Sequence, residues 1–153
     1  MKSSNYFKKG FTLVEITIVI AIIVIISAIS VKVYFNMKEK QAILKDSESI
    51  VSIIEKTRNM SLNRKNDSAY GVKFASSSVT VFAGSTYISG NNISKYDLES
   101  DVKISTISLS SHGTEVGFAK TTGVPNATGT VVLSTSVYTK TITISGTGII
   151  EVK

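Results

Sequence analysis

Residues 8–31 read KKGFTLVEITIVIAIIVIISAISV, and this stretch decides how the chain is organised. Between Phe11 and Val31 the only ionisable side chain is that of Glu15. A helix rises about 1.5 Å per residue, so the run would span roughly 30 Å, the thickness of the hydrocarbon core of a bilayer. We therefore expect residues 11–31 to form a transmembrane helix behind a short basic leader, residues 1–10.

The carboxylate of Glu15 needs a purpose, because an acidic side chain inside hydrocarbon is costly and is normally paired or functional. A cut between Gly10 and Phe11 would free an α-amino group with an ordinary pKa of about 8, at the positive end of the helix. Glu15 is the obvious counter-ion for this amine, from its own chain or from a neighbouring chain. A pair between chains would set the register between subunits.

This junction resembles the class III signal of type IV pilins and pseudopilins. The resemblance rests on Lys9-Gly10 before Phe11, on the following TLVEI at residues 12–16, and on the unbroken Ile/Val stretch. It implies that a prepilin peptidase cleaves after Gly10 on the cytoplasmic face and methylates the new amino terminus at Phe11. It also implies that Lys8 and Lys9 belong to the basic leader, that residues 11–31 form the filament-core helix, and that Glu15 serves recruitment into the filament.

Two other interpretations of the apolar run stay open. A secretory signal peptide has a shorter apolar region and a small-residue cleavage site, for which residues 28–30 are a candidate, but this run is too long and contains Glu15. A permanent single-span anchor shares the length and the basic flank. Lysines on both sides of the run leave its orientation undecided, so the orientation rests on the processing motif.

Residues 32–62 contain neither Pro nor Gly, so we expect one continuous helix of roughly 50 residues. Its second part is amphipathic, unlike the first. The apolar positions at near-helical spacing are Ile43, Leu44, Ile50, Val51, Ile54 and Leu62. Related pilins often carry a proline partway along this helix, but Lys32 stands at that place here.

After a polar break at residues 63–67, the pattern changes to short β-branched and aromatic segments separated by Gly, Ser and Asn. The predicted strands are Tyr70–Phe74, Val79–Phe82, Val102–Ile107, Glu115–Phe118, Thr130–Ser134, Lys140–Ser145 and Ile149–Val152. The predicted fold is therefore α+β: a long N-terminal helix packed on a mostly antiparallel β-sheet head, residues 63–153.

The last third of the chain carries a second resemblance, to the C-terminal half of GspH/FimT-type minor pseudopilins. It rests on Gly117-Phe118, Thr122-Gly123, GTVVL at residues 129–133 and KTITISGTG at residues 140–148. The resemblance implies a subunit present in few copies, at the filament tip or during initiation.

No enzyme chemistry is predicted. The chain has no cysteine, which excludes thiolate catalysis, Cys-ligated metals and disulfides, and its single histidine, His112, lacks a signposted acidic partner. Asp97, Glu99 and Asp101 alternate as calcium ligands might, but Val102 stands where a glycine is expected, which favours a solvated loop. We expect no catalytic residues, metal site or cofactor.

Net charge indicates little about partners. The formal charge is +6, but Lys2, Lys8 and Lys9 leave with the leader, so the mature chain is weakly basic. DNA capture is the alternative worth testing, through basic residues that could contact phosphates. These are Arg58, Arg64, Lys65, Lys95, Lys103, Lys120, Lys140 and Lys153.

The sequence thus predicts a structural subunit of a type IV pilus or of a type II secretion-like pseudopilus. The expected partners are prepilin peptidase, other pilin or pseudopilin subunits, and the cytoplasmic membrane with its assembly platform. Before assembly the chain would be a single-pass protein of that membrane, with the leader in the cytoplasm and the head outside. Afterwards it would lie in an extracellular or periplasmic filament.

Overall fold

The computed structural model describes residues 10–110 and 113–153, without the side chains of residues 28–31. The chain divides into two compact units between Met37 and Lys38, and helix α1 (Leu13–Leu62) contributes residues to both. The segment boundaries predicted after residues 10, 31 and 62 stay predictions.

Helix α1 is 50 residues long, as the lack of Pro and Gly predicts. It stops in the predicted polar break, where Arg64 has a positive φ of 48° and a short 3-10 helix, η1 (Lys65–Asp67), follows. Asn66 and Asp67 also have positive φ, a conformation that short polar side chains tolerate better than most. The break is therefore made by local backbone chemistry, without a glycine.

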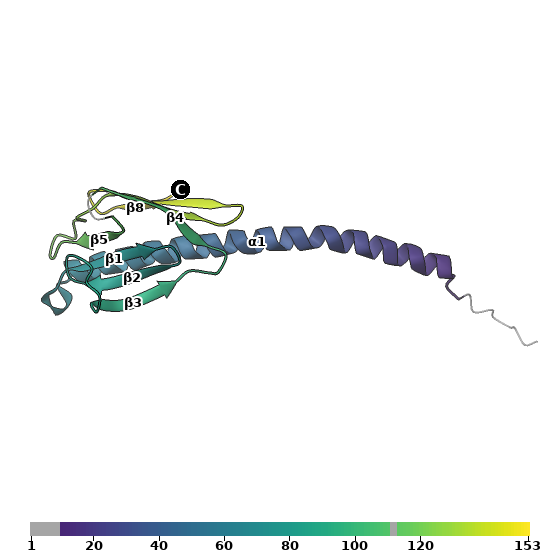
Figure 1. The fold of residues 1–153 in the computed structure, drawn as a ribbon, viewed down its shortest axis with the longest axis horizontal. Coiled ribbons are helices and arrows are strands. Elements are labelled where there is room, and N and C mark those ends of the chain that lie inside the picture. Colours follow the sequence, from purple (N-terminus) through teal and green to yellow (C-terminus); the bar gives the residue numbers. More distant parts are fainter. Residues whose placement is uncertain (1–9, 111–112) are drawn as a thin grey trace, which may run out of the picture. The chain divides into compact units, whose positions relative to one another are not determined.

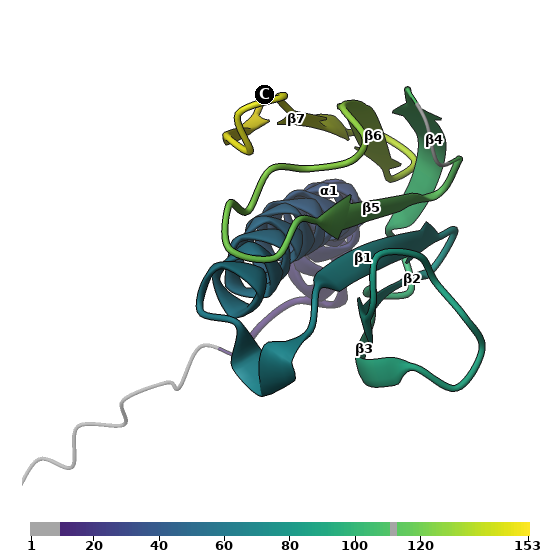
Figure 2. The ribbon, with the colours of Figure 1, turned by 90° about the vertical axis from the view of Figure 1, so that its left-hand side faces the viewer.

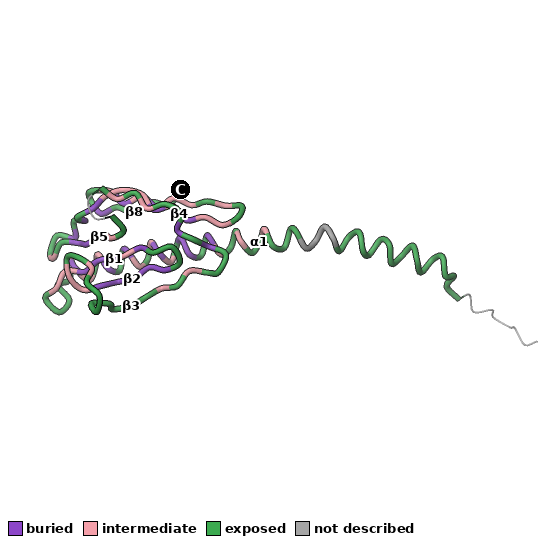
Figure 3. Tube along the Cα trace, in the orientation of Figure 1, coloured by how far each residue is buried: buried purple, intermediate pink, exposed green. Residues whose placement is uncertain are grey.

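In the first unit, every described side chain from Phe11 to Ser27 is exposed (Figure 3). By length and composition α1 is long and apolar enough to cross a membrane, and none of its most apolar window is buried. Over residues 13–27, the predicted transmembrane segment is therefore a helix whose apolar side chains are exposed.

Within its described residues, the second unit combines the rest of α1 with eight strands in two antiparallel sheets (Figure 1). The first sheet has the order β3-β2-β1-β5 and consists of β1 (Tyr70–Ala75), β2 (Ser78–Ala83), β3 (Asn92–Asp97) and β5 (Glu115–Phe118). The second sheet has the order β4-β6-β7-β8 and consists of β4 (Lys103–Leu109), β6 (Gly129–Ser134), β7 (Thr139–Ile144) and β8 (Ile150–Val152). The α+β fold class is thus confirmed.

Seven of these strands overlap the predicted ones, and β3 was missed. Its residues are exposed except for Tyr96, which is half-buried, so the strand has no apolar alternation to reveal it. Strand β3 is an edge strand that pairs only with β2. Edge position explains why a polar sequence is stable in this strand.

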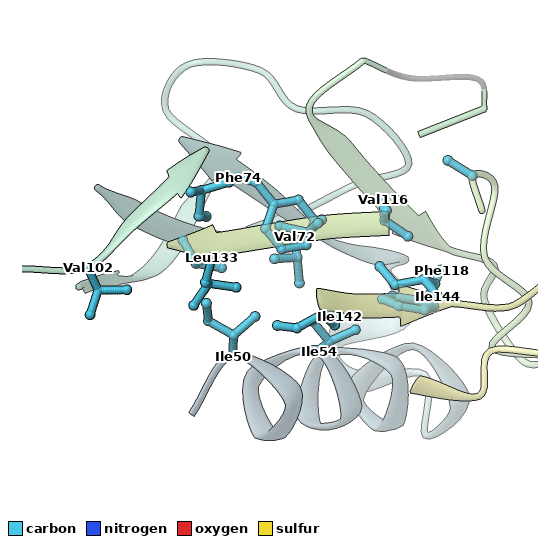
Figure 4. Close-up of a cluster of buried hydrophobic side chains, with 14 of the residues drawn as sticks. Ile50, Ile54, Val72, Phe74, Val102, Val116, Phe118, Leu133, Ile142 and Ile144 are labelled. Carbon is cyan, nitrogen blue, oxygen red and sulfur yellow. The ribbon is translucent and has the colours of Figure 1, made fainter. Parts of the chain in front are cut away.

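The hydrophobic core lies where α1 packs in the angle between the two sheets (Figure 2). Helix α1 contributes Ile43, Ile50 and Ile54, which are at most 2 % exposed. Figure 4 shows Ile50 and Ile54 pointing from the helix toward side chains of the sheets. Leu44, predicted on the same apolar face, is instead exposed. The sheets contribute Val72, Phe74, Val79, Ile104, Val116, Phe118, Val131, Leu133, Ile142 and Ile144, with Val102 and Ala127 from loops.

Candidate processing and assembly site

Helix α1 begins with a reciprocal pair of hydrogen bonds between Thr12 and Glu15. The backbone amide of Glu15 donates to the hydroxyl oxygen of Thr12 at 3.2 Å, and the backbone amide of Thr12 donates to Oε2 of Glu15 at 3.5 Å. This arrangement is a capping box, which satisfies two amides that the first helical turn leaves without partners. The carboxylate of Glu15 therefore has a role within its own chain.

The predicted cleavage point, the peptide bond between Gly10 and Phe11, lies just before this cap and outside α1. Phe11 is 79 % exposed, and a Cβ added at Gly10 would meet no atom within 4 Å. Neither crowding nor a left-handed φ requires glycine at position 10. Any requirement for glycine there would come from a partner that grips this peptide.

The predicted basic residues of the leader, Lys8 and Lys9, lie outside the described residues. The predicted sites Gly10, Phe11 and Glu15 are described and lie within six consecutive residues. Their proximity follows from the sequence, whereas the capping bonds are what the structure adds.

The apolar half of α1 satisfies its own polar groups. The hydroxyl of Thr17 donates to the Val14 carbonyl at 2.8 Å, and that of Ser27 donates to the Ile23 carbonyl at 2.7 Å. Such internal bonds are needed in hydrocarbon, where no water is present to accept them. This half of α1 is therefore chemically suited to lipid.

Residues 7–31 match the family model of the prokaryotic N-terminal methylation motif. The chain carries a class III signal of the type IV pilin and pseudopilin kind. No curated protein and no solved structure matches the chain.

The class III signal supports a pilin-like or pseudopilin subunit that prepilin peptidase processes. It indicates a structural subunit and assembly with other pilin subunits. Together with one apolar N-terminal helix, it fits a membrane-anchored precursor that later forms an extracellular filament.

A buried carboxylate on α1, which sequence reasoning missed, forms hydrogen bonds with the β head. Asp46 is fully buried and accepts hydrogen bonds from the Tyr96 hydroxyl at 2.8 Å and from the Glu99 backbone amide at 2.9 Å. Burial raises the pKa of the Tyr96 hydroxyl. Asp46 thus anchors β3 and the loop after it to the helix. The sequence does not reveal this role, because Asp46 lies between the polar residues Lys45 and Ser47.

The three alternating carboxylates face lysines. Glu99 pairs with Lys45 at 2.6 Å, Asp101 with Lys38 at 3.2 Å, and Asp97 with Lys95 at 2.6 Å. The Lys45 ammonium lowers the pKa of the Glu99 carboxyl, and Glu99 in turn raises the pKa of Lys45. Within residues 10–110 and 113–153 no cluster of His, Asp and Glu suited to a metal ion is present.

Several basic residues considered for DNA contact bind other parts of the head. Arg58 donates to the carbonyls of Gly123 at 3.0 Å and Thr147 at 3.2 Å, and Arg64 donates to the Thr121 hydroxyl at 2.9 Å. Lys95 pairs with Asp97. Lys120 pairs with Asp67, and this cation lowers the pKa of the aspartate. His112, the single histidine, lies outside the described residues.

Proposed function

We propose that this protein is a minor pilin or pseudopilin of a type IV pilus or of a type II secretion-like pseudopilus. Prepilin peptidase removes residues 1–10 and methylates Phe11. The apolar half of α1 first anchors the subunit in the cytoplasmic membrane and then packs against neighbouring subunits in the filament. The β head selects partners.

The observation that carries this proposal is the match of the methylation motif to residues 7–31, together with the geometry at its start. The Gly10–Phe11 peptide lies before the capped end of α1, and Glu15 lies in the first helical turn. A protease needs an accessible peptide, and a recruitment carboxylate needs to lie near the new amine. The exposure of Phe11 and the position of Glu15 in the first turn support the proposal on both points.

Glu15 acts in two steps under this proposal. In the precursor its carboxylate caps the Thr12 amide. After cleavage, the Phe11 ammonium of an incoming or neighbouring subunit offers a stronger, charged donor in the same low-dielectric surroundings. Glu15 thus exchanges an amide donor for an ammonium donor. Because only cleavage creates the ammonium, assembly through Glu15 depends on processing.

Mass spectrometry of the mature chain tests the processing step. The proposal expects an N-methylated Phe11 at the amino terminus. A start near Val31 would identify a secreted protein, and an intact leader would identify a permanent anchor. Either of these results contradicts the proposal.

Substitution tests the assembly step. We expect Glu15→Ala to insert in the membrane and to be cleaved, yet to fall at least about tenfold in sheared filaments, because each 1.4 kcal/mol lost per subunit contact is a factor of ten. Glu48→Ala removes another exposed carboxylate from the same helix and is the matched control. Equal incorporation of both variants would contradict the assigned role of Glu15.

The GspH/FimT subtype stays a proposal. Its support is that the segments carrying the resemblance form β5 to β7 and the turn before β8. Quantitative mass spectrometry of filaments gives the copy number, and a subunit as abundant as the main component would overturn the minor role.

DNA capture gains less support, because Arg58, Arg64, Lys95 and Lys120 have partners within the head. A mobility shift with the purified chain, repeated at two salt concentrations, decides the question, since phosphate contacts weaken steeply with salt.

A further inference from the structure

One end of the head carries a turn with an exposed valine at its tip, and lysines lie at the same end. This end is where α1 enters the second unit: Glu39 accepts a hydrogen bond from the Ser136 hydroxyl at 2.8 Å, in the turn between β6 and β7 (Figure 1). Val137, at the tip of that turn, is 55 % exposed. We call Lys38, Lys40, Lys103, Val137 and Lys140 the basal surface.

The turn that presents Val137 is held by its own hydrogen bonds. The Thr135 amide donates to the Tyr138 carbonyl at 2.8 Å, and the Tyr138 amide donates to the Thr135 hydroxyl at 3.0 Å. The apolar side chain at the tip is thus displayed by an ordered turn. Val137 is therefore available for contact at the tip of the turn.

The lysines gather at the same end of the second sheet. Lys103 is paired in register with Ser134, and Lys140 with Leu133, so both lie within two rungs of the turn. Lys38, on α1, forms an ion pair with Asp101, just before β4. Within the described residues, no carboxylate lies in ion-pair range of Lys40, Lys103 or Lys140.

Acidic groups reduce the charge of this end without reversing it. Asp101 is neutralised by Lys38, and the Glu39 carboxylate is bound by Ser136. The basal surface with these two acids still has more lysines than carboxylates. It is therefore complementary to a negatively charged partner.

Chain length brings this surface close to the membrane. Lys38 follows Val31, the end of the apolar run, by only seven positions. Seven residues span about 10 Å as a helix and roughly 24 Å when fully extended. Since the headgroup layer begins at the edge of the hydrocarbon, the basal surface lies within reach of lipid headgroups when the helix tilts.

We infer that, before assembly, the basal surface docks on an anionic phospholipid headgroup layer, with Lys103 and Lys140 contacting phosphates and Val137 dipping into the interface. The inference rests on the proposed function only for the insertion of residues 11–31. Docking would hold the head at the membrane until the subunit is extracted. Each basic residue at the surface should raise the ratio of docked to free heads about fivefold.

The lack of cysteine makes a direct test simple, because a single introduced thiol can be labelled. The full-length chain carrying Val137→Cys is labelled with a nitroxide and inserted into phosphatidylcholine vesicles with or without phosphatidylglycerol. Collision with an aqueous nickel chelate then reports whether position 137 is exposed to water. Protease protection of the leader confirms insertion first, so failure of the span and failure of docking are distinguished.

A matched probe belongs at the opposite end of the head. Ile88 is 63 % exposed in the loop between β2 and β3, and that loop follows Ala83, which pairs with Tyr70. Tyr70 in turn is bonded to Ser61 in the last turn of α1, far along the helix from Lys38. Ile88→Cys should stay accessible to the nickel chelate in every vesicle.

Charge variants test whether electrostatic attraction causes the docking. Lys103→Gln with Lys140→Gln should lower the ratio of docked to free heads about 25-fold, since each lysine contributes about fivefold. Lys56→Gln with Lys65→Gln changes the net charge equally at positions away from the basal surface and should leave docking unchanged. High salt should release the head because it screens exposed charges.

The proposal is supported if position 137 is shielded only in anionic vesicles, at low salt and with Lys103 and Lys140 intact. Shielding that is equal in both lipids would show uncharged insertion of the turn, and it would overturn the proposal. Full exposure in both lipids, with the span inserted, would overturn it as well.

Discussion

The two halves of α1 have the same backbone and opposite surroundings. From residue 13 to 27 the side chains are exposed and almost wholly apolar. From residue 43 to 61 the buried side chains are partly isoleucines and partly polar residues. In the second half the polar side chains of Asp46, Ser47, Thr57 and Ser61 are buried. Asp46 and Ser61 bond to the head, at Tyr96, Glu99 and Tyr70, whereas Ser47 and Thr57 bond to carbonyls of α1 itself. The first half of α1 therefore suits surroundings outside the chain, and the second half suits the interior of the head.

The largest difference between the two halves is expected when one isoleucine is truncated in each. Ile54 is fully buried and Ile20 is 55 % exposed. Ile54→Ala should lower the free energy of unfolding of the head by about 2–5 kcal/mol, because it leaves a cavity. Ile20→Ala should leave that free energy nearly unchanged.

Denaturant unfolding of the full chain in detergent, followed by tyrosine fluorescence, measures both variants. Equal losses would show that the first half of α1 also stabilises the head, and the contrast between the halves would fail.

The polar side of the comparison is tested at Asp46. Asp46→Ala leaves the Tyr96 hydroxyl and the Glu99 amide without their acceptor. An unsatisfied buried group costs about 1–3 kcal/mol, so we expect a loss of about 2 kcal/mol in the free energy of unfolding. The same denaturation experiment measures it.

Asp46→Asn keeps one acceptor oxygen and should lose less than the alanine variant. Glu48→Ala, an exposed carboxylate two residues away, should cost almost nothing. A loss at Glu48 as large as that at Asp46 would show that charge on the helix matters more than the two hydrogen bonds.

At the other end of α1, the cap is tested by Thr12→Ala. Loss of an N-cap threonine costs about 0.5–2 kcal/mol, and here the cost should be local. Amide hydrogen exchange at residues 13–16 should speed up about fivefold, the equivalent of about 1 kcal/mol. Thr12→Ser should restore slow exchange, and faster exchange in the head would refute the local nature of the effect.

The smallest effect is expected for the exposed pair of Lys45 and Glu99. The pKa of Glu99 is lowered from its ordinary 4.5, so its stabilisation is present above that pH and is lost as the pH falls through the folded-state pKa. The pKa of Lys45 is raised from 10.5, so its stabilisation is lost only at higher alkaline pH. The Tm of Glu99→Gln should therefore lie slightly below that of the wild type at pH 7 and converge with it in acid.

If the pair contributes nothing to stability, the Tm values of the two proteins will coincide at every pH, and this result would contradict the prediction. Glu115→Gln, a half-buried carboxylate that accepts from the Tyr87 amide, is a control from outside this pair.

Sequence reasoning succeeded where one local rule decides the structure. The length of α1 followed from the absence of Pro and Gly, and strands β1 and β2 followed from β-branched and aromatic segments separated by serines. The processing motif was visible because its residues are consecutive. The capping box was visible too, in the spacing of Thr12 and Glu15, but was overlooked.

Sequence reasoning failed where partners lie far apart in the chain. Asp46 meets Tyr96 and Glu99 across about fifty residues, and nothing local distinguishes it from the exposed Glu48. Strand β3 is stabilised by pairing with β2 and by the bond from Tyr96 to Asp46. Because neither partner is visible in its local sequence, its polar composition alone predicts a loop. Leu44 has the spacing of a core residue, yet it is exposed.

Arg58 reaches from α1 to the carbonyls of Gly123 and Thr147, and so closes two loops of the head without a covalent bond. Since the chain has no thiols, this closure is indifferent to oxidation. The head can mature without a thiol oxidant or a disulfide isomerase, and a reducing agent should leave its melting unchanged.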